Sequence, residues 1–138
     1  MAVDQLNASV WLGTAGEAHT LVARGVEYLV DLRAEATPAT MTIPVDHIPI
    51  EDLARDQDEP ILFAARRVKE LADSGVVVGV YCQAGVSRTA AVAIGYLMLE
   101  GMSLDDATAR LRECRPDSLP ALGLWRSLEA IENRLEGP

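Results

Sequence analysis

Apolar and polar positions alternate along the chain in blocks whose lengths fit strands and helices. Short runs rich in Val, Ile and Leu predict strands at residues 9–14, 26–32, 46–50 and 76–81. Longer blocks with helical spacing predict helices at residues 15–24, 59–74, 88–100, 103–113 and 122–135. Because strands and helices alternate, we predict an α/β fold with a mainly parallel sheet of about four to five strands, flanked by helices.

Glycines and polar residues mark the ends of several predicted helices. Gly25, Gly75 and Gly101 each follow a helical block, where a residue that tolerates positive φ commonly ends a helix. Asp58 and Ser103 each precede a helical block. They are the predicted N-caps, since their side chains can accept hydrogen bonds from the first free N–H groups.

Polar residues also follow the predicted strands. Arg33 comes after the second strand, Glu51 and Asp52 come after the third, and Cys82 comes after the fourth. In a parallel sheet these carboxyl ends meet at one edge, where ligands bind. We therefore expect a site at this edge. Arg33 could add positive charge there, but we expect it more simply to be a surface or ion-paired residue.

The most informative stretch is residues 82–89, which read Cys-Gln-Ala-Gly-Val-Ser-Arg-Thr and lie between a predicted strand and a predicted helix. Free N–H groups and the helix dipole favour an anion at such a junction. We call residues 82–88 the anion loop and predict that its backbone surrounds a phosphate, with Gly85 permitting close approach. The residues predicted to bind phosphate are Gln83, Ala84, Gly85, Val86, Ser87 and Arg88.

The side chains of the anion loop indicate a reaction. Arg88 can hold two phosphate oxygens with its planar fork. The same positive surroundings favour the thiolate form of Cys82, which is then a nucleophile, and Thr89 can donate a hydrogen bond to its sulfur. A thiolate that attacks phosphorus is the mechanism of a phosphatase. The alternative is a buried cysteine with a purely structural role.

Residues 81–89 resemble the signature of the dual-specificity protein phosphatases, a family within the cysteine-dependent protein tyrosine phosphatase superfamily. The resemblance covers nearly the whole chain: residues 10–13 are similar to the family's first strand and residues 25–32 to its second. It implies a phosphatase-like fold in a small single-domain form. The family usually has His where this chain has Tyr81, and that histidine helps to organise the loop.

Hydrolysis of a phosphate ester also needs an acid that protonates the leaving oxygen. Residues 47–52 resemble the family segment that carries this general acid, and the resemblance implies Asp52 in the role. Glu51, Asp56 and Asp58 are the alternatives in the same acidic stretch.

We therefore predict a cysteine-dependent phosphomonoesterase that forms a phosphocysteine intermediate. It is predicted to be a protein phosphatase for phosphotyrosine, with phosphoserine and phosphothreonine as further substrates and small phosphomonoesters as another class. The predicted catalytic residues are Cys82, Arg88, Asp52 and Thr89. Two alternatives stay open: a weakly active or inactive phosphate-binding module, suggested by Tyr81, and a rhodanese-like sulfur transferase, which also has a cysteine-headed anion loop.

Composition and charge limit the remaining possibilities. A chain of 138 residues predicts a single phosphatase-like catalytic domain, residues 1–138. The net charge of −9 argues against nucleic-acid partners and anionic membranes. No apolar run approaches the ~18 residues that span a bilayer. Cys82 and Cys114 have no disulfide-like spacing, which favours a reducing compartment, so we expect a cytoplasmic protein. We also expect it to be a monomer. His19 and His47 are isolated, and we expect no metal ion or cofactor.

Overall fold

The computed structural model of the protein describes residues 3–37, 40–84 and 86–137. Within these residues five strands form one sheet in the order β1-β2-β5-β3-β4. The strands are β1 (Asp4–Gln5), β2 (Val10–Thr14), β3 (Tyr28–Arg33), β4 (Val45–Ile50) and β5 (Val78–Cys82). All neighbouring pairs are parallel except β1 and β2, which are antiparallel. The predicted mainly parallel α/β sheet is therefore confirmed.

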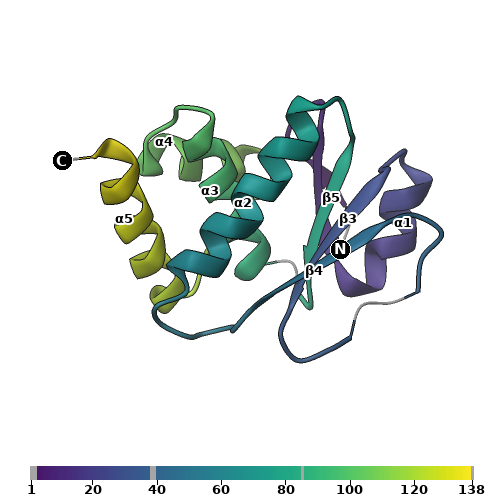
Figure 1. The fold of residues 1–138 in the computed structure, drawn as a ribbon, viewed down its shortest axis with the longest axis horizontal. Coiled ribbons are helices and arrows are strands. Elements are labelled where there is room, and N and C mark those ends of the chain that lie inside the picture. Colours follow the sequence, from purple (N-terminus) through teal and green to yellow (C-terminus); the bar gives the residue numbers. More distant parts are fainter. Residues whose placement is uncertain (1–2, 38–39, 85, 138) are drawn as a thin grey trace.

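Helices cover both faces of this sheet. Helix α1 (Ala18–Ala23) lies on one face and follows a 3₁₀ turn (Ala15–Glu17), whereas the remaining helices gather on the other face (Figure 1). These helices are α2 (Asp58–Asp73), α3 (Arg88–Leu99), α4 (Leu104–Cys114) and α5 (Leu122–Glu136). The predicted stops after helices lie in positive-φ backbone, at 101° for Gly25, 88° for Gly75 and 108° for Gly101.

The two predicted N-caps differ in outcome. The Ser103 hydroxyl accepts a hydrogen bond from the Asp106 N–H at 3.1 Å and caps α4, as the sequence predicted. The prediction for Asp58 is wrong, because α2 begins at Asp58 itself and Gln57 is the cap residue. The Asp58 carboxylate instead lies 3.4 Å from Arg134 of α5, so it serves an ion pair between helices.

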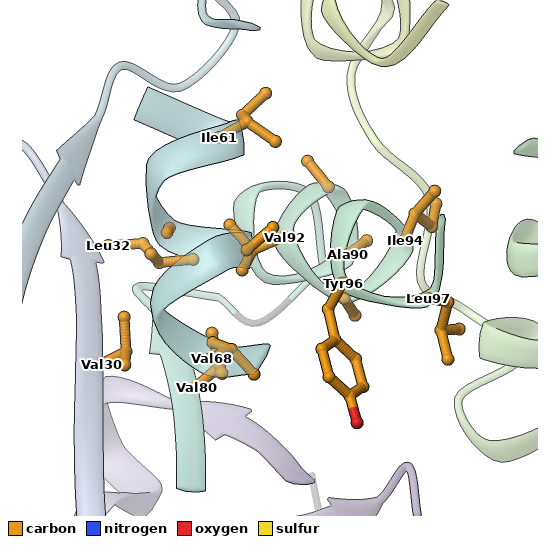
Figure 2. Packing of buried hydrophobic residues seen from close by; sticks show 14 of the residues in the cluster. Val30, Leu32, Ile61, Val68, Val80, Ala90, Val92, Ile94, Tyr96 and Leu97 are labelled. Atoms are coloured by element: carbon orange, nitrogen blue, oxygen red, sulfur yellow. The ribbon is translucent and has the colours of Figure 1, made fainter. Parts of the chain in front are cut away.

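Helix α3 is buried along almost its whole length, and this burial fixes where its N-terminus lies. It packs against α2, α4, α5 and β5. Figure 2 shows Val92 of this helix facing α2, and Ile94 and Leu97 on the opposite side of the helix, all within one hydrophobic cluster. Gly95 lets α2 approach closely, since a Cβ there would lie 3.2 Å from the Cβ of Ala65. This packing fixes the N-terminus of α3 in position at the end of β5.

The parallel strands bring the predicted site residues to one edge of the sheet. β3 ends at Arg33, β4 at Ile50 and β5 at Cys82, and the three strands lie side by side. Arg33 and Cys82 are the last residues of their strands, and Glu51 and Asp52 follow β4, so the polar residues lie at this edge as the sequence predicted. Among the helices that the structure describes, none is long and apolar enough to cross a membrane.

Candidate active site

The anion loop joins β5 to α3. Cys82 is the last residue of β5 and Arg88 is the first residue of α3, so the loop has the strand-to-helix setting that the sequence predicted. Cys82, Arg88 and Thr89 are buried. Of the other predicted phosphate-binding residues, Gln83 and Ala84 are exposed, and Val86 and Ser87 are half-buried. Gly85 lies outside the described residues, and its backbone role stays a prediction.

A short side-chain contact joins Cys82 to Thr89, the residue that follows the anion loop. The Thr89 hydroxyl donates a hydrogen bond to the Sγ atom of Cys82 at 3.0 Å. The hydroxyl proton of Thr89 therefore faces the sulfur atom. The start of α3 adds its positive dipole end at the same place. Cys82 therefore lies between a hydroxyl donor and the N-terminal end of a helix.

The Arg88 guanidinium makes an ion pair that sequence reasoning missed. Its Nη1 and Nη2 atoms donate to the two carboxylate oxygens of Glu35, at 2.6 and 2.8 Å. Nη1 also donates to the carbonyl oxygen of Ile50 at 3.3 Å. The remaining donor, Nε, is buried and has no hydrogen-bond acceptor in the part of the chain that the structure describes. One side of the guanidinium is thus held, and the other side is available to an oxyanion.

The charges around Arg88 shift the pKa values of both partners. The pKa of Glu35 falls to about 2, mainly because Arg88 donates hydrogen bonds to its carboxylate. The pKa of Arg88 rises, first through the hydrogen bond with Glu35 and also through the negative charges of Cys82, Glu35 and Asp52, although burial opposes the rise. The contribution of Asp52 indicates that this carboxylate lies within electrostatic range of the anion loop.

Asp52 lies in the loop between β4 and α2, residues 51–57, which we call the acid loop. Its side chain is exposed, and one carboxylate oxygen accepts a hydrogen bond from the Leu53 N–H at 3.1 Å. Among the alternative acids, Glu51 and Asp56 are also exposed, and Asp58 is paired with Arg134. Asp52 follows Ile50 by two residues, and the Ile50 carbonyl contacts Arg88 directly. Of the carboxylates in this loop, Asp52 contributes to the pKa of Arg88, and its role as the general acid stays a prediction.

Tyr81, the residue at the family's usual histidine position, belongs to a separate network. Its hydroxyl donates to Asp31 Oδ2 at 3.0 Å, and both residues are buried. Arg33 pairs with the same carboxylate, at 3.1 Å from Nε to Oδ1 and 2.9 Å from Nη2 to Oδ2, and its guanidinium lies over the Tyr81 ring. Burial and the Asp31 charge raise the pKa of Tyr81 to about 12, so this residue stays a neutral donor. Arg33 is ion-paired, as the sequence predicted.

A C-terminal segment supports the anion loop, and nothing in the sequence pointed to it. The Leu119 N–H donates to the Val86 carbonyl at 3.1 Å. The Ala121 N–H donates to the Ser87 hydroxyl oxygen at 2.9 Å. These bonds satisfy polar groups of the loop without using the N–H groups that would face an anion.

Comparison with known proteins identifies the family. The sequence profile described as "Dual specificity phosphatase, catalytic domain" matches residues 10–134. The chain belongs to the dual-specificity phosphatase family. The match includes residues 82–88, and the catalytic domain is that of a tyrosine-type, dual-specificity protein phosphatase.

Relatives and solved structures in the dual-specificity phosphatase family agree with this assignment. The chain is 36% identical to mouse dual specificity phosphatase 28 over 129 residues, which is 88% of this chain and 77% of the relative. It is 33% identical to the human protein of the same name, over 93% of this chain and 76% of the relative. The crystal structure of human dual specificity phosphatase 28 superposes with a TM-score of 0.85 and 28% identity, covering 98% of this chain and 95% of that one.

A second solved structure is that of a mouse putative dual specificity phosphatase complexed with zinc tungstate. It superposes with a TM-score of 0.85 and 28% identity, covering 97% of this chain and 88% of that chain. In the present protein, the described His, Cys, Asp and Glu side chains form no group of three or more that could hold a metal ion.

Proposed function

We propose that the protein hydrolyses phosphomonoesters on proteins through a phosphocysteine intermediate, with phosphotyrosine as a substrate and phosphoserine and phosphothreonine as further ones. The observation that carries this proposal is the buried Arg88 guanidinium, which lies within electrostatic range of Cys82 and has an Nε–H group that lacks an acceptor among the described residues. A buried donor without a partner is costly, and a phosphoryl oxygen would satisfy it. The tungstate complex of the mouse relative supports an oxyanion ligand, because tungstate is tetrahedral like phosphate.

In the first step, the Cys82 thiolate attacks phosphorus, an S–P bond forms and the bond from phosphorus to the leaving oxygen breaks. Arg88 and the N–H groups of the anion loop hold the other phosphoryl oxygens as charge develops on them. Asp52, protonated, gives its proton to the leaving oxygen, and the dephosphorylated product departs.

In the second step, the Asp52 carboxylate takes a proton from a water molecule, whose oxygen attacks phosphorus. The S–P bond breaks and inorganic phosphate is released. The Thr89 hydroxyl, 3.0 Å from the Cys82 sulfur, stabilises the departing thiolate. Both steps are completed without a metal ion or cofactor.

The nucleophile is tested by Cys82→Ser. This variant is expected to lose turnover of p-nitrophenyl phosphate and of a phosphotyrosine peptide while still binding vanadate, because a serine hydroxyl is not ionised at neutral pH. Wild-type protein quenched with acid during turnover should carry one phosphoryl group on Cys82, detected by mass spectrometry. Residual turnover above about one per cent of wild type would remove Cys82 from the role.

The acid is tested by Asp52→Asn with two leaving groups. A general acid matters in proportion to how poorly the leaving group departs, so kcat/KM for phenyl phosphate should fall about 10²-fold, and kcat/KM for 2,4-dinitrophenyl phosphate far less. The alkaline limb of the pH profile with phenyl phosphate should flatten. Glu51→Gln and Asp56→Asn are the controls and should show no such selectivity. An equal loss on both substrates would assign the acid to another group.

The alternatives make different predictions. An inactive phosphate-binding module would bind vanadate without turning over p-nitrophenyl phosphate. A sulfur transferase would form a persulfide on Cys82 from thiosulfate, but the family match over residues 10–134 does not favour this activity.

We further propose that residues 1–138 act as one monomeric catalytic domain in the cytoplasm. Size-exclusion chromatography with light scattering tests whether the protein is a monomer.

A further inference from the structure

The acid loop holds an unusual backbone that its own sequence does not favour. Leu53 and Asp56 both have positive φ, at 61° and 57°, although neither is glycine. Aspartate tolerates this region, but a leucine rarely adopts it, and its strain persists only where the surroundings impose it. The loop must therefore be held from outside, and its neighbours show how.

Part of the restraint comes from Gln57, at the end of the loop. Its side-chain oxygen accepts a hydrogen bond from the Glu51 N–H at 3.0 Å, and its side-chain nitrogen donates to the Arg55 carbonyl at 3.1 Å. The two ends of the loop are thereby joined across Asp52. This closes the loop but does not fix where the loop lies relative to Cys82.

Helix α5 fixes that position through Ser127 and Gly123. The Gln57 N–H donates to the Ser127 hydroxyl oxygen at 3.0 Å, and the Ser127 hydroxyl donates to the Gly123 carbonyl at 3.2 Å. The backbone of Ala54 lies directly against Gly123, and any Cβ at position 123 would overlap the Ala54 carbonyl group. A glycine inside a helix lowers helix stability, so its presence is explained by this close approach.

The same short segment also contacts the anion loop. Leu119 and Ala121 donate to Val86 and to Ser87, as described above. Residues 119–127, which we call the supporting segment, thus contact the anion loop at one end and the acid loop at the other. Two loops that are separated in the sequence therefore contact one short segment.

We propose that Gly123 and Ser127 are positioning residues for proton transfer, which hold the acid loop so that Asp52 faces the leaving oxygen of a phosphate bound at the anion loop. This inference rests on the proposed function of Asp52. Proton transfer requires the acid within hydrogen-bond reach of the leaving oxygen, and a shift of about 1 Å can cost up to 10²-fold in rate. Neither residue needs to touch the substrate.

The test compares Ser127→Ala and Gly123→Ala with Asp52→Asn on phenyl phosphate and 2,4-dinitrophenyl phosphate. Both variants should lose roughly tenfold or more of kcat/KM with phenyl phosphate and much less with the dinitrophenyl ester. In the Asp52→Asn background neither substitution should lower kcat/KM further, because the group that they position is already absent. The vanadate inhibition constant and the rate of Cys82 alkylation by iodoacetamide should not change in Ser127→Ala.

Ser74→Ala is the matched control, because the Ser74 hydroxyl likewise donates to a helix carbonyl, that of Leu71, at the end of α2 far from the acid loop. It should leave both substrates unaffected. If Asp52→Asn shows the selective loss and Ser127→Ala does not, the inference fails while the proposed function stands, even where Gly123→Ala misfolds. A loss that is equal on both substrates, or that multiplies with that of Asp52→Asn, also overturns the inference. If Asp52→Asn shows no selective loss, the assignment of Asp52 fails and the inference fails with it.

Discussion

The ion pair between Glu35 and Arg88 determines which donors of the guanidinium are available to a ligand. Glu35 accepts from Nη1 and Nη2, so it holds one edge of the planar group. Nε then faces no acceptor among the described residues, which leaves the adjacent edge for two-point contact with a phosphoryl group. A lysine at position 88 could not contact both partners in this way, because its ammonium has no planar fork.

Glu35→Gln should remove a pH-dependent contribution to stability. The pKa of Glu35 is about 2 in the folded protein, below the ordinary value of 4.5, so the pair stabilises the fold above pH 4.5 and loses this effect as pH falls toward 2. Because about half of the Glu35 side chain is exposed, at 51%, we expect only about 0.5 kcal/mol at pH 6. Urea unfolding of both proteins between pH 6 and pH 3 measures the difference, which should shrink as the pH falls. A difference that grows toward pH 3 would contradict the assigned pair.

Tyr81→Phe should destabilise the fold. The Tyr81 hydroxyl donates to the fully buried Asp31, and hydrogen bonds to buried charged groups contribute about 1.5 kcal/mol or more. Urea unfolding should therefore show a lower midpoint with an unchanged slope. Tyr28→Phe is the control, since the Tyr28 hydroxyl donates to the partly exposed Asp46 at 2.8 Å and should matter less. A smaller loss for Tyr81→Phe than for Tyr28→Phe would show that the buried network contributes little.

At the scale of secondary structure, capping and burial explain why the helices begin and end where they do. Ser103→Ala removes the side-chain acceptor that satisfies the Asp106 N–H at the start of α4. The loss of an N-cap costs about 1 kcal/mol, so thermal unfolding should occur a few degrees lower, with activity unchanged. Ser74→Ala serves as the control, because Ser74 caps no helix N-terminus. An equal decrease in the two variants would mean that the Ser103 cap adds nothing specific.

The elements that the sequence predicted correctly are those whose signal is local. The runs that became β2, β3, β4 and β5 are long enough to show β-branched enrichment, and α3 to α5 show helical spacing over three or more turns. Strand β1 was not predicted, since Asp4–Gln5 is too short to show a period and exists through its pairing with Trp11 and Leu12. The cap of α2 was misplaced because a contact with Arg134, far along the chain, engages Asp58.

The same distinction holds for the candidate site. The anion loop could be predicted because its residues are contiguous and lie between a strand and a helix. Glu35 could not, because the ion pair with Arg88 joins residues 53 positions apart. The sequence did contain an acidic residue, Glu35, shortly after β3 at the edge of the sheet, but nothing local linked it to Arg88. Ser127 was equally hidden, since its contact with Gln57 spans 70 positions.

At the scale of the whole molecule, the net negative charge of the protein repels a negatively charged substrate. The chain carries a net charge of −9, yet the proposed site must bind a dianion. Arg88, the loop N–H groups and the start of α3 supply positive charge at the site, whereas the net charge makes the field of the whole molecule negative. Long-range attraction cannot assist an acidic substrate, and only contacts made inside the site favour binding.

The overall charge should appear as a salt dependence that changes sign with the substrate. The test uses two phosphotyrosine peptides of equal length, one with acidic and one with basic residues flanking the phosphotyrosine. Raising the ionic strength from about 0.02 to 0.3 M shortens the Debye length from roughly 20 Å to about 6 Å and screens the distant field. The value of kcat/KM should then rise several-fold for the acidic peptide and fall for the basic one, because association is repelled in the first case and attracted in the second. p-Nitrophenyl phosphate has no flanking residues, so its change in kcat/KM measures the effect of salt on the site itself. The change for each peptide is divided by this change. If both peptides then respond to salt in the same direction and by the same factor, the net charge has no part in substrate selection, and selection must come from contacts beside the anion loop.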